Sequence, residues 1–251
     1  MPLATGIIAS LIVFSFTTIL TIAGVGAAFI IIPAFYWLGV PLKEAMATAL
    51  LLNGISMAIA SFTFIKNRLV AFGTALPIII VASALSPLGA YSTQFVSRDT
   101  LLWLFVGFLT FAGSMMLFFK AKKREVQRSH VQELGTGTAV GGAAGYLGGL
   151  LGVGGGNFIV PALVWLGFDP KKASGTTAFI VIFSSLAGFL GHTAMGHVNV
   201  PLLLLSALGS IAGAYLGSWL MAKKLQSAQV KAVIGVVLYL IAAKMLWGLV
   251  G

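Results

Sequence analysis

Gly24-Val-Gly-Ala-Ala-Phe-Ile-Ile-Ile-Pro33 recurs 128 residues later in the sequence as Gly152-Val-Gly-Gly-Gly-Asn-Phe-Ile-Val-Pro161. Between 24–49 and its counterpart, 12 of 26 positions are identical, whereas matched composition alone gives about two or three. Further on, at a shift of 124 residues, Gly89-Ala90-Tyr91 recurs as Gly213-Ala214-Tyr215. The sequence therefore consists of two homologous halves.

Around this repeat, the sequence has the composition of a membrane protein. Hydrophobic residues make up 59% of the 251 residues and charged residues 8%, and the mean hydropathy is +1.06. A soluble domain averages about 25% charged residues. We therefore expect an all-α integral membrane protein. Apolar stretches that approach the length of a membrane-spanning helix occur near 5–23, 73–93, 99–119, 200–220 and 231–250.

The distribution of Lys and Arg predicts how many segments each half contains. The stretch 5–38 could be one interrupted crossing or two pieces that meet at Gly24-Val25-Gly26. A single crossing divides the 15 Lys and Arg residues 8 to 7 between the two sides, whereas two pieces divide them 12 to 3. Cytoplasmic loops carry the excess of Lys and Arg, so we expect five segments per half.

An odd number of segments inverts the second half relative to the first. We expect inverted repeats at 1–120 and 135–251, joined by a charged cytoplasmic linker at 121–134, with both termini outside the cytoplasm. Inverted repeats are a common plan of secondary transporters. No aromatic residue interleaves the cations of the linker, which indicates contact with lipid headgroups rather than nucleic acid.

The segments 27–38 and 156–167 are too short to cross the membrane. Twelve residues span about 18 Å as a helix, against a hydrocarbon core of ~30 Å, so we expect half-helices that follow Gly-rich breaks and border an internal cavity. The start of a helix exposes unpaired N–H groups and a positive dipole end, which suit an anion. The alternative is that glycine only lets helices pack closely, which explains the glycines of 141–149 better than those of the breaks.

The candidate substrate site combines the two breaks with polar residues on the helices that follow them. Uncharged donors suit an oxyanion that must leave again, although Ser and Thr in membrane helices also bond their own i−4 carbonyls. The members of the candidate site are Gly24, Gly26, Phe29, Asn53, Ser56, Gly152, Gly154, Gly155, Gly156, Asn157, Thr176 and Ser184.

The two breaks differ in what they offer a ligand. In the second, three consecutive glycines let backbone N–H groups approach, and the Asn157 amide can donate to an oxyanion or cap the helix. The matching positions of the first break are Ala27, Ala28 and Phe29. We therefore expect the charged head of the substrate at Gly154–Asn157 and its carbon end at Ala27–Phe29.

The chain lacks the residues that most enzymes and metal sites need. A cation transporter normally carries a buried carboxylate, and the acidic residues here all lie at loops or expected helix ends, which favours an anionic or neutral substrate. There is no cysteine, no His-x-x-x-His pair and no Lys-Ser/Thr after a Gly-rich loop. We expect no enzyme, no catalytic residue, no cofactor and no metal. The acidic residues are Glu44, Asp99, Glu125, Glu133 and Asp169.

His192 is the candidate carrier of a coupling proton, since histidine changes its charge near physiological pH. It is expected near the outer end of its helix. The alternative is an interfacial histidine without a role.

At these residues the chain resembles the TauE/SafE sulfite exporter family. The resemblance rests on Gly-x-Gly-Gly-Gly-x-x-x-x-Pro at 152–161 and on Lys172-Ala173-x-Gly175-Thr176-Thr177, which is similar to the family's Ala-x-Gly-Thr-Ser element. It covers essentially the whole chain and departs from the pattern at Ala27 and Ala28. It implies transport of sulfur-containing or organic anions such as sulfite, sulfoacetate or related organosulfonates.

Together these features predict a secondary transporter that moves a small anion across the cytoplasmic membrane by alternating access. The expected partners are the anion and membrane lipid, and a homodimer is left open. Two alternatives remain. One is a membrane scaffold or assembly factor that packs through its glycines and transports nothing, and the other is an anion channel.

Overall fold

The computed structural model describes residues 3–118, 130–193 and 200–250. These residues form ten α-helices and one π-helical turn and contain no β-strand, which confirms the all-helical class and the ten predicted segments. Residues 121–129 of the predicted linker lie outside the described residues, and 130–134 begin α6. The helices are α1 (Leu3–Ala23), α2 (Ala28–Trp37), α3 (Leu42–Lys66), α4 (Phe72–Ser92), α5 (Arg98–Phe118), α6 (His130–Leu150), α7 (Gly156–Trp165), α8 (Pro170–Thr193), α9 (Val200–Trp219), η1 (Leu220–Lys224) and α10 (Ser227–Val250).

Two of the helices, α2 and α7, are short, with 10 residues each where the sequence predicted about twelve. Each follows glycines with the left-handed backbone conformation, which glycine alone adopts without strain. Each ends before another left-handed glycine, Gly39 or Gly167, which terminates the helix earlier than predicted. The left-handed glycines of the breaks are Gly24, Gly26, Gly152, Gly154 and Gly155, with φ between 68° and 79°.

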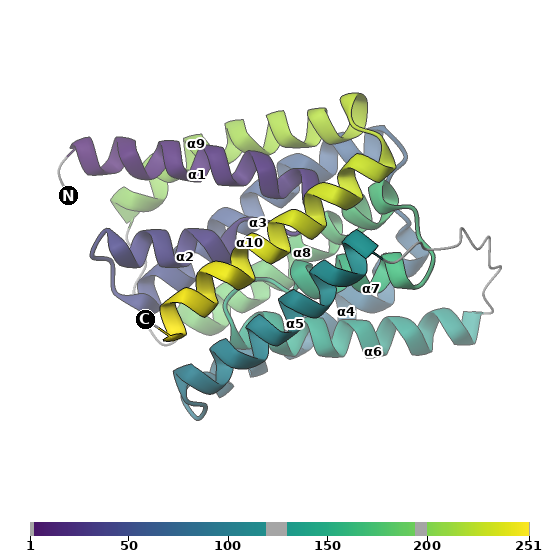
Figure 1. Cartoon of the computed structure of the whole chain (residues 1–251), viewed down its shortest axis with the longest axis horizontal. Helices are drawn as coiled ribbons and strands as arrows, with labels where there is room; N and C mark the ends of the chain where they lie inside the picture. Colours follow the sequence, from purple (N-terminus) through teal and green to yellow (C-terminus); the bar gives the residue numbers. More distant parts are fainter. Residues whose placement is uncertain (1–2, 119–129, 194–199, 251) are drawn as a thin grey trace.

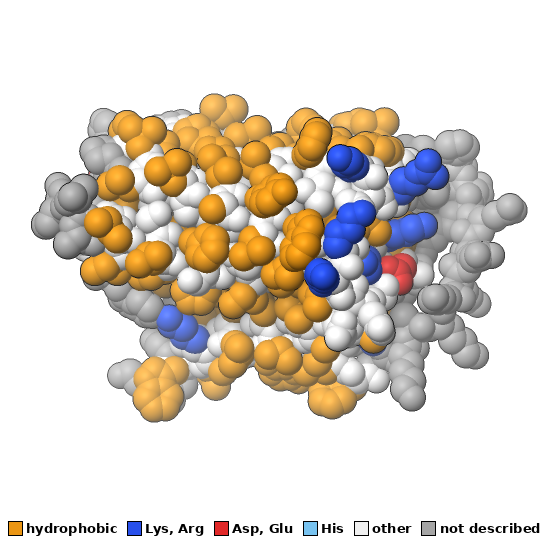
Figure 2. Space-filling view, turned by 90° about the horizontal axis from the view of Figure 1, so that it is seen from above, with side chains coloured by type: hydrophobic (Ala, Val, Ile, Leu, Met, Phe, Trp, Pro, Cys, Tyr) orange, Lys and Arg blue, Asp and Glu red, His pale blue; other side chains and the backbone are white. Residues whose placement is uncertain are grey.

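Six of the described helices are long and apolar enough to cross a membrane, by length and composition. Large hydrophobic side chains such as Phe62 and Trp247 point outward from the bundle. Figure 2 shows hydrophobic side chains over most of one long face, with most Lys and Arg side chains near one end. The six apolar segments are Gly6–Ala23, Glu44–Lys66, Phe72–Ser92, Pro170–Thr193, Leu202–Lys224 and Ser227–Trp247.

The central helices α3 and α8 pack against each other and are the most buried of these six. In Figure 1, α1 lies beside α9 on one side of the bundle, and α4 packs on α6 on the opposite side. Since α1 corresponds to α6 and α4 to α9 in the repeat, these two pairs are equivalent. The half-helices follow the same rule, because α2 packs on α3 and α7 packs on α8. The halves therefore repeat each other in packing as they do in sequence.

Glycine permits the close contact in both outer pairs. A Cβ added to Gly145 on α6 would overlap the backbone of Ala82 on α4. A Cβ added to Gly213 on α9 would lie 2.6 Å from the carbonyl oxygen of Phe14 on α1. Small residues let helix backbones approach in this way, so close packing accounts for these glycines outside the breaks.

Candidate functional site

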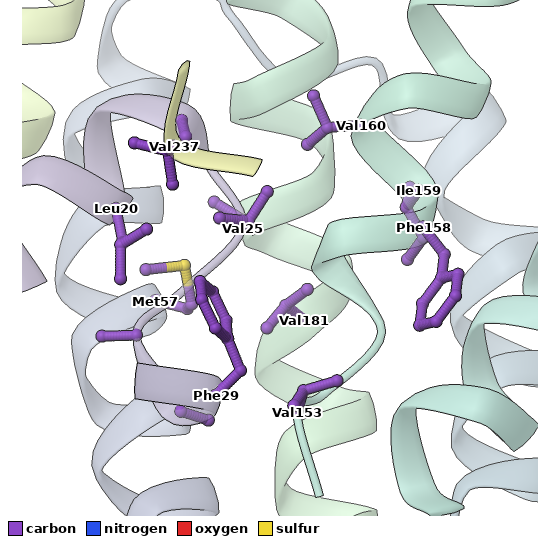
Figure 3. Close-up of a cluster of buried hydrophobic side chains, with 14 of the residues drawn as sticks. Leu20, Val25, Phe29, Met57, Val153, Phe158, Ile159, Val160, Val181 and Val237 are labelled. Carbon is purple, nitrogen blue, oxygen red and sulfur yellow. The ribbon is translucent and has the colours of Figure 1, made fainter. Parts of the chain in front are cut away.

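The structure brings the two glycine breaks into contact inside the bundle. A Cβ added to Gly156, at the start of α7, would overlap the carbonyl oxygen of Val25 in the first break. Figure 3 shows Val25 and Val153, one from each break, with Val181 of α8 drawn between them. The starts of both half-helices therefore lie in the same buried region.

Asn53 on α3 ties the first break to the second half of the chain. Its Oδ1 accepts a hydrogen bond from the N–H of Ala27 at 2.8 Å, and its Nδ2 donates to Ser185 Oγ on α8 at 2.9 Å. Nearby, Ser174 Oγ on α8 donates to the carbonyl oxygen of Ala23 at 2.9 Å. The Asn53 amide is thus used within the protein at both its oxygen and its nitrogen, and it satisfies an N–H group at the start of the first half-helix.

The second break is bound by α8 through two backbone carbonyls. Ser184 Oγ donates to the carbonyl oxygen of Gly154 at 2.7 Å, and His192 Nε2 lies 3.2 Å from the carbonyl oxygen of Gly149. Ser184 therefore bonds the break rather than its own i−4 carbonyl. One helix fixes both ends of this break.

Asn157, the second residue of α7, is fully buried, and neither its amide oxygen nor its amide nitrogen makes a hydrogen bond. It does not cap α7, whose N-cap residue is Gly155 without a side-chain cap. The backbone N–H groups of Gly156 and Asn157 have no backbone acceptor either. Leaving a buried polar group unpaired costs roughly 1–3 kcal/mol, and such groups are rare in proteins. These unpaired donors at a helix start form a candidate anion site.

The two breaks differ at positions that the repeat makes equivalent. Asn53, which pairs an N–H of the first half-helix, corresponds to Val181, so α8 provides no such acceptor to the second half-helix. Asn157 corresponds to Phe29, whose ring is only 6% exposed and lies near Met57 in Figure 3. The first break supplies its own acceptor, whereas the second presents donors without one.

Two predicted site residues use their hydroxyl groups away from the breaks. Thr176 Oγ1 accepts a hydrogen bond from the N–H of Ala71 at 3.0 Å, just before α4. Ser56 Oγ donates to the carbonyl oxygen of Asn53 at 2.9 Å within α3. Both bonds are internal to the protein, so these hydroxyls contribute to holding the helices that carry the breaks.

Ser174 and Ser185 help to fix the breaks, and neither was among the predicted site residues. Their counterparts in the first half are Met46 and Met57. The repeat therefore gave no signal for a polar role at these positions. A polar face on α8, with Ser174, Ser184 and Ser185 all buried, was the only available sign.

The breaks are closed to the outside in this structure, since their glycines and Asn157 are buried. A surface hollow lies elsewhere, beside the end of α7. Access to the breaks from outside the protein would therefore require a movement of helices. Among the side chains that the structure describes, no three His, Cys, Asp or Glu residues group into a metal site. The surface hollow beside the end of α7 is lined by Phe111, Ser114, Met115, Phe118 and Trp165.

The chain is similar to several proteins named as probable membrane transporters. YunE of Bacillus subtilis (strain 168) is 30% identical, over 92% of this chain and 93% of that protein. YfcA of Escherichia coli (strain K12) is 26% identical, over 90% of this chain and 84% of that protein. MJ0441 of Methanocaldococcus jannaschii is 24% identical, over 77% of this chain and 78% of that protein. No solved structure matches the chain.

The sequence also matches the family described as sulfite exporter TauE/SafE, over residues 8–245. This range contains both glycine breaks, both half-helices and the helices that bind them. The resemblance noted in the sequence is thereby confirmed. The chain is a multi-pass membrane protein that belongs to the sulfite exporter TauE/SafE family, a family of transporters and not of enzymes.

Proposed function

We propose that the chain is a secondary transporter that moves a small anion across the cytoplasmic membrane by alternating access, with the charged head of the anion at the second break. The observation that carries this proposal is the buried Asn157 amide without a hydrogen bond at the start of α7. An oxyanion would accept hydrogen bonds from the amide nitrogen and from the free N–H groups beside it, at the positive end of the helix.

The polarity of the interior favours an anion over a cation. Among the described residues, the buried polar side chains are Ser, Thr, Asn and a single His, without a carboxylate. A cation inside a membrane protein would normally be paired with Asp or Glu. Uncharged donors, by contrast, stabilise an anion without binding it so strongly that it cannot leave.

The inverted arrangement of the halves is supported by where the chain ends and the charges lie. Figure 1 shows α1 starting and α10 ending at the same end of the bundle, and Figure 2 shows most Lys and Arg side chains near the other end. Cytoplasmic regions carry the excess of these cations. We place that end in the cytoplasm and both termini outside it.

Sulfite and organosulfonates are the proposed substrates, because the family is named for sulfite export. Their three oxygens fit a cluster of N–H donors. The Asn157 oxygen is also unpaired, so a ligand with a donor, such as bisulfite or a hydroxyalkyl sulfonate, would satisfy the whole amide. The apolar side chains of Ala27 to Phe29 would then face the carbon end of a larger substrate.

Uptake into liposomes tests the proposal. Reconstituted protein should take up labelled isethionate, sulfoacetate or sulfite with saturation and counterflow. Gly156→Leu should abolish uptake, because its side chain would be forced into Val25. Gly107→Leu is the matched control, since a Cβ added to Gly107 meets no atom within 4 Å.

Each alternative predicts a different result. Flux that rises linearly with concentration and shows no counterflow would identify a channel. A protein that neither transports these anions nor is stabilised by them, as a ligand stabilises the state that binds it, would be a scaffold. Normal uptake by Gly156→Leu would show that the second break is not the substrate site.

A further inference from the structure

We infer that His192 is the proton-binding residue of this transporter, and that a proton on its imidazole strengthens anion binding at the second break. The inference rests on the proposed function. It comes from the position of His192, which together with Ser184 binds the two ends of that break to α8.

The contacts of His192 connect it directly to the fold of the break. Its Nε2 lies 3.2 Å from the carbonyl oxygen of Gly149, and the same carbonyl accepts the N–H of Gly152 at 3.1 Å. Ser184, about 12 Å away along α8, donates to Gly154 at the other end of the break. A change in the charge of His192 therefore alters the strength of its hydrogen bond to the Gly149 carbonyl, at which the break begins.

Within the described residues, His192 is the one buried histidine, and it is only 3% exposed. It packs against α6 through Gly149, and its neighbour Gly191 lies beside Ala90 on α4. The other titratable side chains of α8 and of the helices packed on it are Lys43, Glu44, Lys66, Tyr91, His130, Glu133, Tyr146, Lys171, Lys172, Lys231, Tyr239 and Lys244.

Tyr91 and Tyr146 are exposed. His130, Glu133, Lys171 and Lys172 lie at the starts of α6 and α8, at the opposite end of each helix from Gly149 and His192. Lys43 and Glu44 lie at the start of α3, where Leu50 is beside Gly188 of α8. These two charged residues are therefore at the end of the α3–α8 pair where His192 lies.

The repeat shows that this arrangement is specific to the second half. The position equivalent to His192 is Phe64, which is buried and cannot bond a carbonyl. The position equivalent to Ser184 is Ser56, whose hydroxyl bonds within its own helix. At this position, histidine thus occurs only in the half of the chain that also carries the unpaired Asn157 amide.

The sign of the coupling follows from charge. When Nε2–H donates to Gly149, the lone pair of Nδ1 takes the proton, and the resulting imidazolium makes a charge-assisted hydrogen bond. A positive charge in the buried interior attracts an anion at the far end of the break more strongly than it would in water. Because linkage is reciprocal, bound anion also favours protonation. A proton and a monovalent anion carried together move no net charge.

Calorimetric titration with isethionate in detergent at about pH 5.5 and about pH 8 tests the inference, because a sulfonate stays ionised across the range in which histidine titrates. We expect roughly tenfold tighter binding at the lower pH, a typical size for coupling between two sites. We also expect proton uptake on binding, seen as a dependence of the measured heat on the ionisation enthalpy of the buffer.

Three variants separate protonation from structure. His192→Gln keeps an N–H donor for Gly149, so it should bind isethionate with an affinity that no longer depends on pH and without proton uptake. His192→Phe, the residue of the first half, should also lose both effects. His197→Gln, which changes the next histidine in the sequence, should behave as the unmodified protein.

Two results would overturn the inference while leaving the proposed function intact: binding by the unmodified protein that does not depend on pH, or a pH dependence that survives in His192→Gln. If the unmodified protein binds neither isethionate nor sulfite at any pH, the proposed function fails and the inference fails with it.

Discussion

The Asn157 side chain is buried at the start of α7, and neither end of its amide is hydrogen-bonded. Such a group destabilises the substrate-free protein, because its hydrogen bonds to water are lost on burial and not replaced. Binding sites accept this cost when a ligand later supplies the partner. Stability and substrate affinity should therefore respond to this residue in opposite directions.

We predict that Asn157→Leu raises the unfolding temperature and weakens isethionate binding by about fivefold or more. The loss corresponds to about 1 kcal/mol or more for a hydrogen bond to a charged group. Thermal unfolding with and without isethionate measures both effects in one experiment. Asn67 directly follows α3 and donates a side-chain hydrogen bond to the carbonyl oxygen of Thr63. As a control, Asn67→Leu should leave the affinity for isethionate unchanged. A less stable Asn157→Leu protein with normal affinity would contradict the assignment.

Asn53 differs from Asn157 in that its amide oxygen and nitrogen both make hydrogen bonds to protein groups. We predict that Asn53→Val, which copies the Val181 of the second half, lowers the free energy of unfolding by about 1–3 kcal/mol, since it leaves the buried N–H of Ala27 without an acceptor. Denaturant unfolding in detergent measures the change. Ser185→Ala removes only the second bond and should cost less.

A double-mutant cycle between Asn53→Val and Ser185→Ala tests the bridge itself. The two residues share one hydrogen bond, so their effects should not add, and the interaction free energy should be about 1 kcal/mol. Strict additivity would mean that Asn53 and Ser185 do not act on each other. Asn53 would then support the first break alone.

The repeat explains which of these residues the sequence could identify. Asn157 could be recognised because it differs from Phe29 within an otherwise matching segment. The bonding of Asn53 could not, because its partner Ser185 lies 132 residues away and the two positions are not equivalent in the repeat. Such a bond depends on how α3 packs against α8, and helix periodicity carries no information about that contact.

At the scale of elements, the sequence predicted two half-helices, and the structure contains them with slightly different ends. The predicted half-helices were 27–38 and 156–167, and the structure has them at Ala28–Trp37 and Gly156–Trp165. The predicted number of segments was right because the glycine clusters and the distribution of Lys and Arg, on which it rested, can both be read directly from the sequence. The ends were wrong because hydropathy continues through Leu38 and Leu166, whereas the left-handed glycines that follow turn the chain out of the helix.

Helix pairs in both halves depend on glycine, and α6 offers two neighbouring glycines with different surroundings. A Cβ on Gly145 would overlap the backbone of Ala82, whereas a Cβ on Gly142 would make an ordinary contact with Leu85 at 3.7 Å. We predict that Gly145→Ala lowers the free energy of unfolding by about 1–3 kcal/mol through overpacking. Gly142→Ala should be neutral or stabilising by up to about 1 kcal/mol, because alanine favours the helix.

Denaturant unfolding of both variants in the same detergent measures the difference. The pair is informative because both substitutions add one methyl group to the same helix, so helix propensity cancels between them. Equal stabilities would show that α4 and α6 can separate without cost. Close approach through glycine would then not hold this pair together.

At the scale of the whole molecule, a symmetric scaffold carries an asymmetric site. Equivalent helices make equivalent pairs, from α1 with α9 and α6 with α4 to the half-helices on α3 and α8. The polar contacts at the breaks do not follow this symmetry, because Asn157 and His192 correspond to Phe29 and Phe64. In the proposed function, packing symmetry would let the two halves exchange conformations, as alternating access requires, and the charged group of the anion would bind at the second break alone.

The orientation in the membrane is the last prediction. If the halves are inverted with the cation-rich end in the cytoplasm, the loop after α4 lies outside the cell and the loop before α10 lies inside. Gln94 and Gln226 are exposed residues in these two loops. The chain has no cysteine, so single Gln94→Cys and Gln226→Cys substitutions can be labelled without background.

We predict that a membrane-impermeant maleimide applied to intact cells labels Gln94→Cys and leaves Gln226→Cys unlabelled until the membrane is permeabilised. The physical reason is that the loop before α10 follows Lys223 and Lys224, and regions rich in Lys and Arg are retained in the cytoplasm. Labelling of both cysteines in permeabilised cells controls for access. The reverse pattern would place the cation-rich end outside. Labelling of both positions from one side would mean that the number of crossings between residues 94 and 226 is even, which the inverted five-plus-five arrangement forbids.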